Sequence, residues 1–369
     1  MSDRLHRLFS EQGQSPWLDN LQRGYITSGH LKTVLDTGIR GLTSNPTIFQ
    51  KAIQGSADYD EQFASATAAG LSTQDAYWDL VTKDIDGALN VFEPLYETSS
   101  GLDGFVSVEV DPSLADDGEA TLVAAKHLHQ RISRPNVMIK IPATNAGIPA
   151  IESMIADGCN VNVTLIFSLD RYQQVMNAFI SGLERRCAKK LPISGIASVA
   201  SFFISRVDTE IDNRLTAIGT SGAQSLCGTA AISQARLAYQ LFEHTFSGPR
   251  WQKLALQGAE VQRPLWASTS TKNPVYPDTM YVDELIGPHT VNTLPEATIA
   301  AFSQRGELKC KITSDLEGAR QRWQALGACG VDVNDVAHVL EREGVLSFQK
   351  SFDDLMAALS AKASTHKGS

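Results

Sequence analysis

The sequence of 369 residues lacks several features that large classes of protein require. Its five cysteines are scattered, odd in number and free of a CxxC pair, which argues against a disulfide framework or a zinc site. Glycine-rich phosphate loops of the GxGxxG and GxxxxGK[ST] types are absent. No run approaches about 18 consecutive apolar residues, and the first residues do not resemble a signal peptide. We therefore expect a cytoplasmic protein that binds no nucleotide through those loops.

Basic residues are also fewer than acidic residues. The chain has 41 acidic and 32 basic residues, a formal net charge of −9, which argues against nucleic-acid or membrane partners. Among eight histidines, His127 and His129 stand two apart on an expected helix, where positions i and i+2 face different directions. We expect no metal site. A hydrophobic content of 43% indicates a globular chain with ample material for a core.

One lysine stands where an apolar residue is expected. Lys140 lies near the end of the run 136–144, which otherwise has the composition of a buried strand. An unpaired ammonium in apolar surroundings is costly, and the usual response is a lowered pKa and a neutral amine. A neutral lysine amine is a nucleophile that forms a Schiff base with a carbonyl substrate. The alternative is a lysine whose stem reaches out to water.

Polar residues share one face of three successive expected strands. Side chains of a strand alternate between two faces, so polar residues with the same parity point the same way. The intervening segments 119–128 and 146–157 have helical patterns, and strands separated by helices pair in parallel. The face opposite the apolar residues carries Ser107, Glu109 and Asp111 in the first strand, Lys140 in the second, and Asn160, Asn162 and Thr164 in the third.

Alternation of strand and helix continues along almost the whole chain. Eight strands separated by helices predict a single α/β domain over residues 1–369, a (β/α)8 TIM-type barrel with additional helices. The alternative is an open doubly wound sheet, which would normally show a glycine-rich turn after its first strand. Residues 361–369 are polar and predict a disordered tail. Strands are expected at Trp17–Leu18, Ile39–Thr43, Phe105–Val110, Val137–Ile141, Val161–Phe167, Ile196–Phe202, Pro264–Thr269 and His289–Thr293.

Two polar residues near strand ends allow a functional or a local structural interpretation. Asn45 precedes Pro46 in a turn after the second strand, which is either part of a site or a plain Asn-Pro turn. Asp19 follows the first strand and is either a site carboxylate or the cap of the next helix.

The late strands carry hydroxyl groups and cations. Arg206 opens a helix, where a cation is mildly unfavourable because of the helix dipole. Either a bound anion or an ion pair with Asp208 or Glu210 would account for it. Ser270 and Lys272 belong to a hydroxyl-rich loop after the seventh strand, which is a plausible phosphate cradle.

Taken together, these motifs resemble the transaldolases, in particular their longer bacterial form, within the class I aldolase superfamily. Residues 41–47, GLTSNPT, look like the first family signature, and residues 137–144, VMIKIPAT, look like the Schiff-base signature. Residues 108–111, 162–168 and 201–206 also match in the family order. The resemblance of the site motifs extends from about Trp17 to about Pro274, and it plausibly continues to a C-terminal helix around Phe348.

The resemblance implies reversible transfer of a dihydroxyacetone unit between sugar phosphates of the pentose phosphate pathway, through a Schiff base on Lys140. It implies that no cofactor is needed, because the protonated imine is itself the electron sink. It implies that Asp19 takes the proton from the C4 hydroxyl, and that Glu109, with a water held by Thr164, moves protons during imine formation. The implied ligands are Asn45, Asn162 and Ser201 for the dihydroxyacetone hydroxyls, and Arg206, Ser270 and Lys272 for the phosphate.

One departure and two alternatives remain. Lys272 stands where better-known family members carry arginine, so a point charge replaces a bidentate fork. A simple aldolase would release dihydroxyacetone to water, although apolar Phe203 beside the site favours transfer. A catalytically inactive barrel that only binds sugar phosphates would be expected to lack one of Asp19, Glu109 or Lys140, and all three are present. The sequence leaves the oligomeric state open, a homo-oligomer included.

Overall fold

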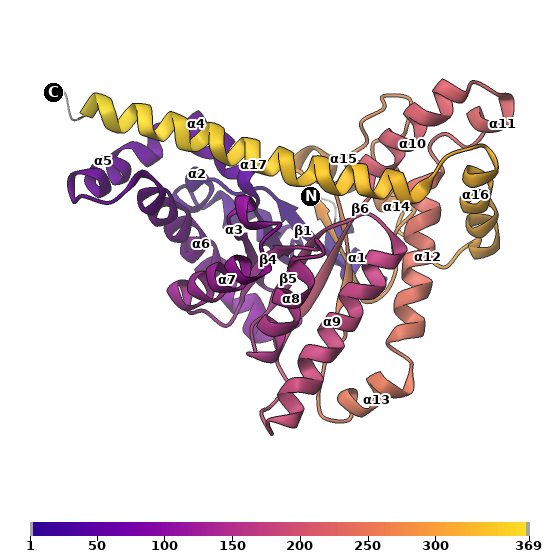
Figure 1. Cartoon of the computed structure of the whole chain (residues 1–369), viewed down its shortest axis with the longest axis horizontal. Helices are drawn as coiled ribbons and strands as arrows, with labels where there is room; N and C mark the ends of the chain where they lie inside the picture. Colours follow the sequence, from indigo (N-terminus) through magenta and orange to yellow (C-terminus); the bar gives the residue numbers. More distant parts are fainter. Residues whose placement is uncertain (1–2, 367–369) are drawn as a thin grey trace.

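Eight parallel strands close into a barrel in the computed structural model, which describes residues 3–366 (Figure 1). Each strand pairs with the next along the chain, and the eighth pairs with the first. The predicted barrel is confirmed, and the alternative of an open sheet is wrong. The strands are β1 (Gln14–Asp19), β2 (Gly41–Thr43), β3 (Phe105–Glu109), β4 (Val137–Pro142), β5 (Val161–Ile166), β6 (Ser198–Phe203), β7 (Arg263–Ala267) and β8 (Thr290–Leu294).

Helices surround the barrel and fill the connections between its strands. Those of the first half are α1 (Arg4–Ser10), α2 (Arg23–Thr27), α3 (His30–Asp36), α4 (Pro46–Gly55), α5 (Asp60–Ala68), α6 (Thr73–Thr98), α7 (Gly118–Ile132), α8 (Gly147–Ala156) and α9 (Leu169–Ala188), with short 3₁₀ turns at Ala57–Tyr59 and Pro112–Leu114. Those of the second half are α10 (Ser205–Ile218), α11 (Ser221–Gln224), α12 (Ala230–Thr245), α13 (Pro249–Ala255), α14 (Met280–Asp283), α15 (Glu296–Arg305), α16 (Leu316–Ala328) and α17 (Val333–His366). None of the helices in this described part of the chain combines the length and apolar content needed to cross a membrane.

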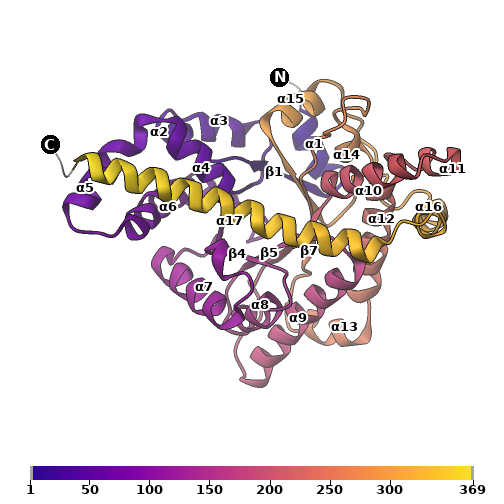
Figure 2. The same ribbon diagram turned by 45° about the horizontal axis from the view of Figure 1, so that its top comes forward.

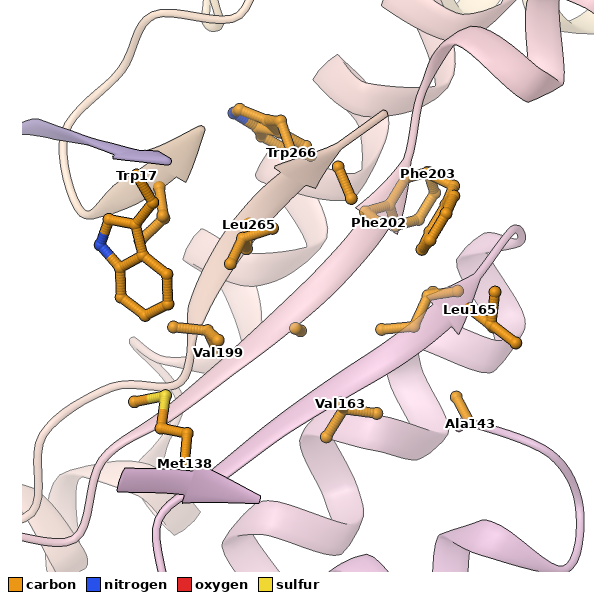
Figure 3. Close-up of a cluster of buried hydrophobic side chains, with 14 of the residues drawn as sticks. Trp17, Met138, Ala143, Val163, Leu165, Val199, Phe202, Phe203, Leu265 and Trp266 are labelled. Carbon is orange, nitrogen blue, oxygen red and sulfur yellow. The ribbon is translucent and has the colours of Figure 1, made fainter. Parts of the chain in front are cut away.

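Large apolar side chains fill the barrel interior. Trp17 and Met138 are fully buried and lie among the core side chains of the barrel strands (Figure 3). Gly41 makes room for the indole, because a Cβ at this position would lie 2.4 Å from Cε2 of Trp17. The barrel is therefore a packed core, and a ligand can enter only at the ends of the strands.

The last helix crosses the carboxyl ends of the strands. Figures 1 and 2 show α17 as a long yellow helix that runs over the barrel from the α10 side to the α5 side. Gly344 allows a close approach, since a Cβ there would lie 2.9 Å from Cδ2 of Leu165 on β5. Further along α17, Ser351 shares a hydrogen bond of 2.8 Å with Thr47 of α4. A segment from the far end of the chain therefore covers the barrel mouth.

The C-terminal end differs from expectation. The polar composition of residues 361–369 predicted a disordered tail, whereas α17 continues as helix to His366. The packing of α17 across the barrel carries the helix further than local composition suggests, and Leu359 near this end is still buried. Residues 367–369 lie outside the described part of the chain.

Candidate active site

Strand register brings three of the predicted residues into one row. Glu109 of β3 is the register partner of Lys140 on β4, and Lys140 is the partner of Asn162 on β5. All three are buried, and Lys140 is only 4% exposed. The lysine stem therefore does not lead the ammonium to water, and that alternative is wrong.

The Lys140 ammonium is enclosed by acceptors. Its Nζ lies 3.2 Å from Oε2 of Glu109 and donates a hydrogen bond of 3.2 Å to the carbonyl oxygen of Ser44. The ring of Phe348, from α17, has its centroid 5.8 Å from the same nitrogen. A buried lysine beside a carboxyl group that can take up its proton is a candidate nucleophile for a carbonyl substrate.

Glu109 is the second titratable group at this position. Burial raises the pKa of its carboxyl, and the charges of Lys140 and Arg206 lower it in part. Apart from the contact with Lys140, neither carboxyl oxygen has a hydrogen-bond partner among the described residues. A carboxyl with a raised pKa and free oxygens is suited to moving protons near neutral pH.

Thr164 lies at an irregular point of β5. The register between β5 and β6 shifts between Val163 and Ile166, and Leu165 has a φ of 59°. This conformation is strained for a leucine, and such strain often marks functional sites. The bulge leaves the buried Thr164 hydroxyl with no hydrogen-bond partner in the described residues, so it can hold a water or a substrate group.

Asn162 joins Ser107 and Ser201 in a chain of hydrogen bonds. Asn162 donates from Nδ2 to Oγ of Ser107 at 3.0 Å, and its Oδ1 accepts from Oγ of Ser201 at 2.7 Å. Ser201 faces the cavity, whereas fully buried Asn162 lies behind it and orients its hydroxyl. Direct contact of Asn162 with a substrate stays a prediction.

The Asn45 side chain caps a helix with its oxygen and keeps its amide N–H groups unused. Its Oδ1 accepts a hydrogen bond of 3.0 Å from the Ile48 amide and so caps α4, which begins with Pro46. Capping uses only the oxygen, and the side chain also lines the cavity, so its amide N–H groups remain to bind a ligand.

Asp19 is the last residue of β1 and lies half-buried in the cavity wall. Gln22, not Asp19, occupies the N-cap position of the helix that follows, and no side chain caps it, so the alternative in which Asp19 is the cap is wrong. Burial raises the pKa of the Asp19 carboxyl, and the cations Lys140, Lys272 and Arg206 lower it in part. The mouth therefore contains two carboxyl groups with raised pKa values.

The predicted phosphate residues gather at the late strands. Arg206 is the second residue of α10, and its guanidinium carbon lies 5.0 Å from the ring centroid of Phe203. The expected alternative partners are engaged elsewhere: Asp208 accepts from the Ala231 amide and Tyr281, and Glu210 pairs with Arg214. The ion-pair explanation of Arg206 is therefore wrong.

The loop after β7 supplies the other two predicted phosphate residues. Lys272 Nζ donates to Oγ of Ser270 at 2.8 Å, and both side chains line the cavity. Burial lowers the pKa of the Lys272 ammonium, as do the charges of Arg206 and Lys51, whereas Asp19 raises it. A cationic end with hydroxyl groups is a suitable binding place for phosphate.

Eight of the ten predicted site residues line one cavity of about 530 Å³ at the mouth of the barrel, namely Asp19, Asn45, Lys140, Thr164, Ser201, Arg206, Ser270 and Lys272. Glu109 and Asn162 are buried and do not line it. Lys51 of α4 and Phe348 of α17 line it without having been assigned to the site from the sequence. For Lys51, the sequence signal was its position four residues after Thr47, which puts both on the same face of a helix. For Phe348, the sequence indicated only a C-terminal helix, because the position of this side chain depends on how α17 packs.

Comparison with known proteins agrees with this arrangement. The family model described as Transaldolase/Fructose-6-phosphate aldolase matches residues 16–359. A transaldolase from Parafrankia sp. is 50% identical, over 94% of this chain and 95% of its own length. Transaldolase 1 of Streptomyces avermitilis is 48% identical, over 97% of this chain and 95% of its own length. The chain belongs to the transaldolase/fructose-6-phosphate aldolase family.

Members of the transaldolase/fructose-6-phosphate aldolase family are enzymes, and the cavity described above is the candidate active site of this chain. Within residues 3–366, no group of three or more His, Cys, Asp or Glu side chains is arranged to hold a metal ion.

Proposed function

We propose that this protein is a transaldolase that transfers a dihydroxyacetone unit from sedoheptulose 7-phosphate to glyceraldehyde 3-phosphate, giving erythrose 4-phosphate and fructose 6-phosphate, in the pentose phosphate pathway. The observation that carries the proposal is the buried Lys140 amine, which lies 3.2 Å from Glu109 at the mouth of a barrel. The family match and the transaldolase names of relatives near 50% identity support it.

Imine formation is the first step of the proposed reaction. The Glu109 carboxylate first takes a proton from the Lys140 ammonium. The neutral amine then attacks the ketose carbonyl carbon and forms a carbon–nitrogen bond, while the carbonyl oxygen becomes a hydroxyl group. Glu109 passes a proton to this hydroxyl, with a water held by Thr164 as relay, and the hydroxyl leaves as water. The product is a protonated imine, which withdraws electrons from the neighbouring carbon.

Carbon–carbon cleavage follows on the other side of the cavity. Asp19 removes the proton of the C4 hydroxyl, the bond between C3 and C4 breaks, and its electron pair moves into the imine to give an enamine. The C4 oxygen becomes the carbonyl of the departing aldehyde. The second aldehyde then accepts the enamine carbon in the reverse sequence, and Asp19 returns the proton.

The dihydroxyacetone unit stays bound between the two half-reactions. Ser201 and Asn45 offer donors to its hydroxyl groups, and Asn162 orients Ser201. Arg206, Ser270 and Lys272 hold the phosphate of the departing and arriving sugars.

Transfer is favoured over release of dihydroxyacetone to water. Phe203 is 6% exposed and packs against Phe167, with the ring centroids 5.1 Å apart, and Phe348 covers the lysine from α17. Apolar walls hinder hydrolysis of the enzyme-bound intermediate. Release of dihydroxyacetone at the rate of transfer would favour the simple aldolase. The cytoplasmic location and the oligomeric state stay predictions.

Borohydride trapping with fructose 6-phosphate tests the chemistry. We expect intact-mass and peptide mass spectrometry to find a reduced dihydroxyacetone adduct on Lys140. The Lys140→Ala and Lys140→Arg variants should give no adduct and no turnover, since a guanidinium stays charged. Lys126→Ala, which changes a partly exposed lysine on α7 that pairs with Asp157, is the matched control and should react like the wild type. Substrate binding without an adduct on Lys140 would contradict the proposed mechanism.

A further inference from the structure

Cations outnumber carboxylates in the cavity. Lys51, Arg206 and Lys272 line it, and within residues 3–366 none of the three makes an ion pair. Lys140, the fourth cation of the lining, is paired with Glu109. Asp19 is the one carboxylate residue that lines the cavity. Three unpaired cations less one carboxylate leave an excess of two positive charges.

Lys51 is directed into the cavity by the face of its helix. Thr47, Ile48, Lys51 and Ala52 all line the cavity, and this spacing describes a single side of α4. The helix is fixed at its start by the Asn45 cap and to α17 by the hydrogen bond between Thr47 and Ser351. The base of the Lys51 side chain therefore has a defined position, whereas its exposed end is free to follow a ligand.

Like charges of this kind repel one another unless an anion lies between them. The charges of Arg206 and Lys51 both act against the charge of Lys272, which burial also disfavours. Asp19 favours the charges of Lys272 and Arg206, and Glu109 and Glu343 also favour that of Arg206, but among the described residues only Asp19 brings a carboxylate to the cavity lining. A phosphate monoester carries about −1.5 to −2 charges at pH 7, which matches the excess of two.

We propose that Lys51 binds the phosphate group of the sugar phosphates, as a third cation beside Arg206 and Lys272. This inference rests on the proposed function and extends the set of residues that family resemblance implies. Lys272 provides a point charge in place of an arginine fork, and Lys51 supplies a second point charge to the same group. Lys51 thereby selects phosphorylated over unphosphorylated sugars.

Replacing Lys51 with methionine removes the charge and keeps most of the stem. We expect Lys51→Met to raise KM for fructose 6-phosphate roughly 3- to 10-fold, with kcat changed less than about two-fold, because a phosphate contact is uniform binding. KM for unphosphorylated fructose should not change. Titration calorimetry with inorganic phosphate should show a weaker dissociation constant by a similar factor. Lys51→Arg should retain most of the phosphate affinity.

Lys83→Met is the matched control, since Lys83 is an exposed lysine of α6 that does not line the cavity. It should leave every constant at its wild-type value. An unchanged phosphate affinity in Lys51→Met, or an equal rise in KM for fructose, would overturn the inference. Absence of turnover in the wild type would instead overturn the proposed function, and the calorimetric comparison would still decide the role of Lys51.

Discussion

Lys140 owes its chemical environment to its immediate neighbours. A carboxylate oxygen and a backbone carbonyl, each 3.2 Å from Nζ, stabilise the ammonium in a place that water hardly reaches. Glu109 lies on β3, the neighbour of β4, and Ser44 directly follows β2, where its hydroxyl donates to the carbonyl of Ser107 on β3. The position of the amine is therefore set by the barrel. The amine therefore needs little reorganisation before it attacks a carbonyl group.

The adjacent carboxyl group should govern the rate of imine formation. We expect Glu109→Gln to lower kcat by roughly 10²–10⁴, the range typical of general acid–base groups. Stopped-flow or borohydride-trapping rates with fructose 6-phosphate measure this. Asp111→Asn is the matched control, because Asp111 is on the same chain segment but binds Gln74 and Ser113 instead of Lys140.

The pH dependence of the wild type belongs to the same prediction. Burial raises the pKa of Glu109, so its carboxylate form is lost at a higher pH than in a free glutamate, and activity falls as pH decreases through this raised value. The acidic limb of the trapping rate should therefore lie above about pH 4.3, the ordinary value for glutamate. Wild-type rates in Glu109→Gln would remove this residue from the mechanism.

At the scale of elements, the phosphate end depends on the connection between α10 and the loop after β7. The hydroxyl of Tyr276 donates to Oδ2 of Asp212 on α10 at 2.6 Å, and Oδ1 of Asp212 accepts from the Gly228 amide at 2.9 Å. Gly228 also makes room for the tyrosine, since a Cβ there would lie 2.7 Å from the ring. This contact fixes the loop that carries Lys272 to the helix that carries Arg206.

Loosening that connection should weaken phosphate binding without altering the chemistry. We expect Tyr276→Phe to raise KM for fructose 6-phosphate about 2- to 10-fold, the equivalent of one hydrogen bond, and to leave kcat close to wild type. Steady-state kinetics with phosphorylated and unphosphorylated ketoses separate the two effects. Tyr239→Phe removes a tyrosine hydroxyl that binds Pro288 instead, and it should change neither constant. A fall in kcat alone would show that Tyr276 does not position the loop.

At the scale of the whole molecule, the two ends of the barrel have different tasks. The mouth contains the unpaired cations and the carboxyl groups with raised pKa values, whereas the opposite end contains a network of ion pairs. There Asp103 lies 2.6 Å from Arg40 and 3.1 Å from Arg263, and it accepts a hydrogen bond of 3.0 Å from Ser15. These residues lie at or before the starts of β1, β2, β3 and β7, so the network joins the ends of four strands.

Removing the carboxylate charge should destabilise the fold. We expect Asp103→Asn to lower the free energy of unfolding by about 3–5 kcal/mol, because two arginines would lose their buried counter-charge. Urea unfolding at pH 7 measures the change, and kcat should be unaffected while the protein is folded. Asp86→Asn removes an exposed partner of Arg134 and should cost only about 0–1 kcal/mol. A loss below about 1 kcal/mol in Asp103→Asn would show that this network contributes little to the free energy of unfolding.

Much of the fold and of the candidate site could be predicted from the sequence. The alternation of strand and helix predicted the barrel, and strand parity put Glu109, Lys140 and Thr164 on the same side. Both patterns are local, because each depends on residues a few positions apart. The remote residues could not be found this way. Nothing near Phe348 indicates that it covers a lysine about two hundred positions earlier in the chain.

The sequence by itself determined the order of the elements, the apolar and polar faces of the strands, and the chemical groups available at their ends. Only the tertiary structure decided which alternatives hold: Arg206 is free of Asp208, Asp19 is no helix cap, and Asn162 lies behind Ser201. It also brought Lys51 to the cavity. The physical reason is that register and helix packing are set by contacts between distant segments, and the burial and charge of each group follow from those contacts.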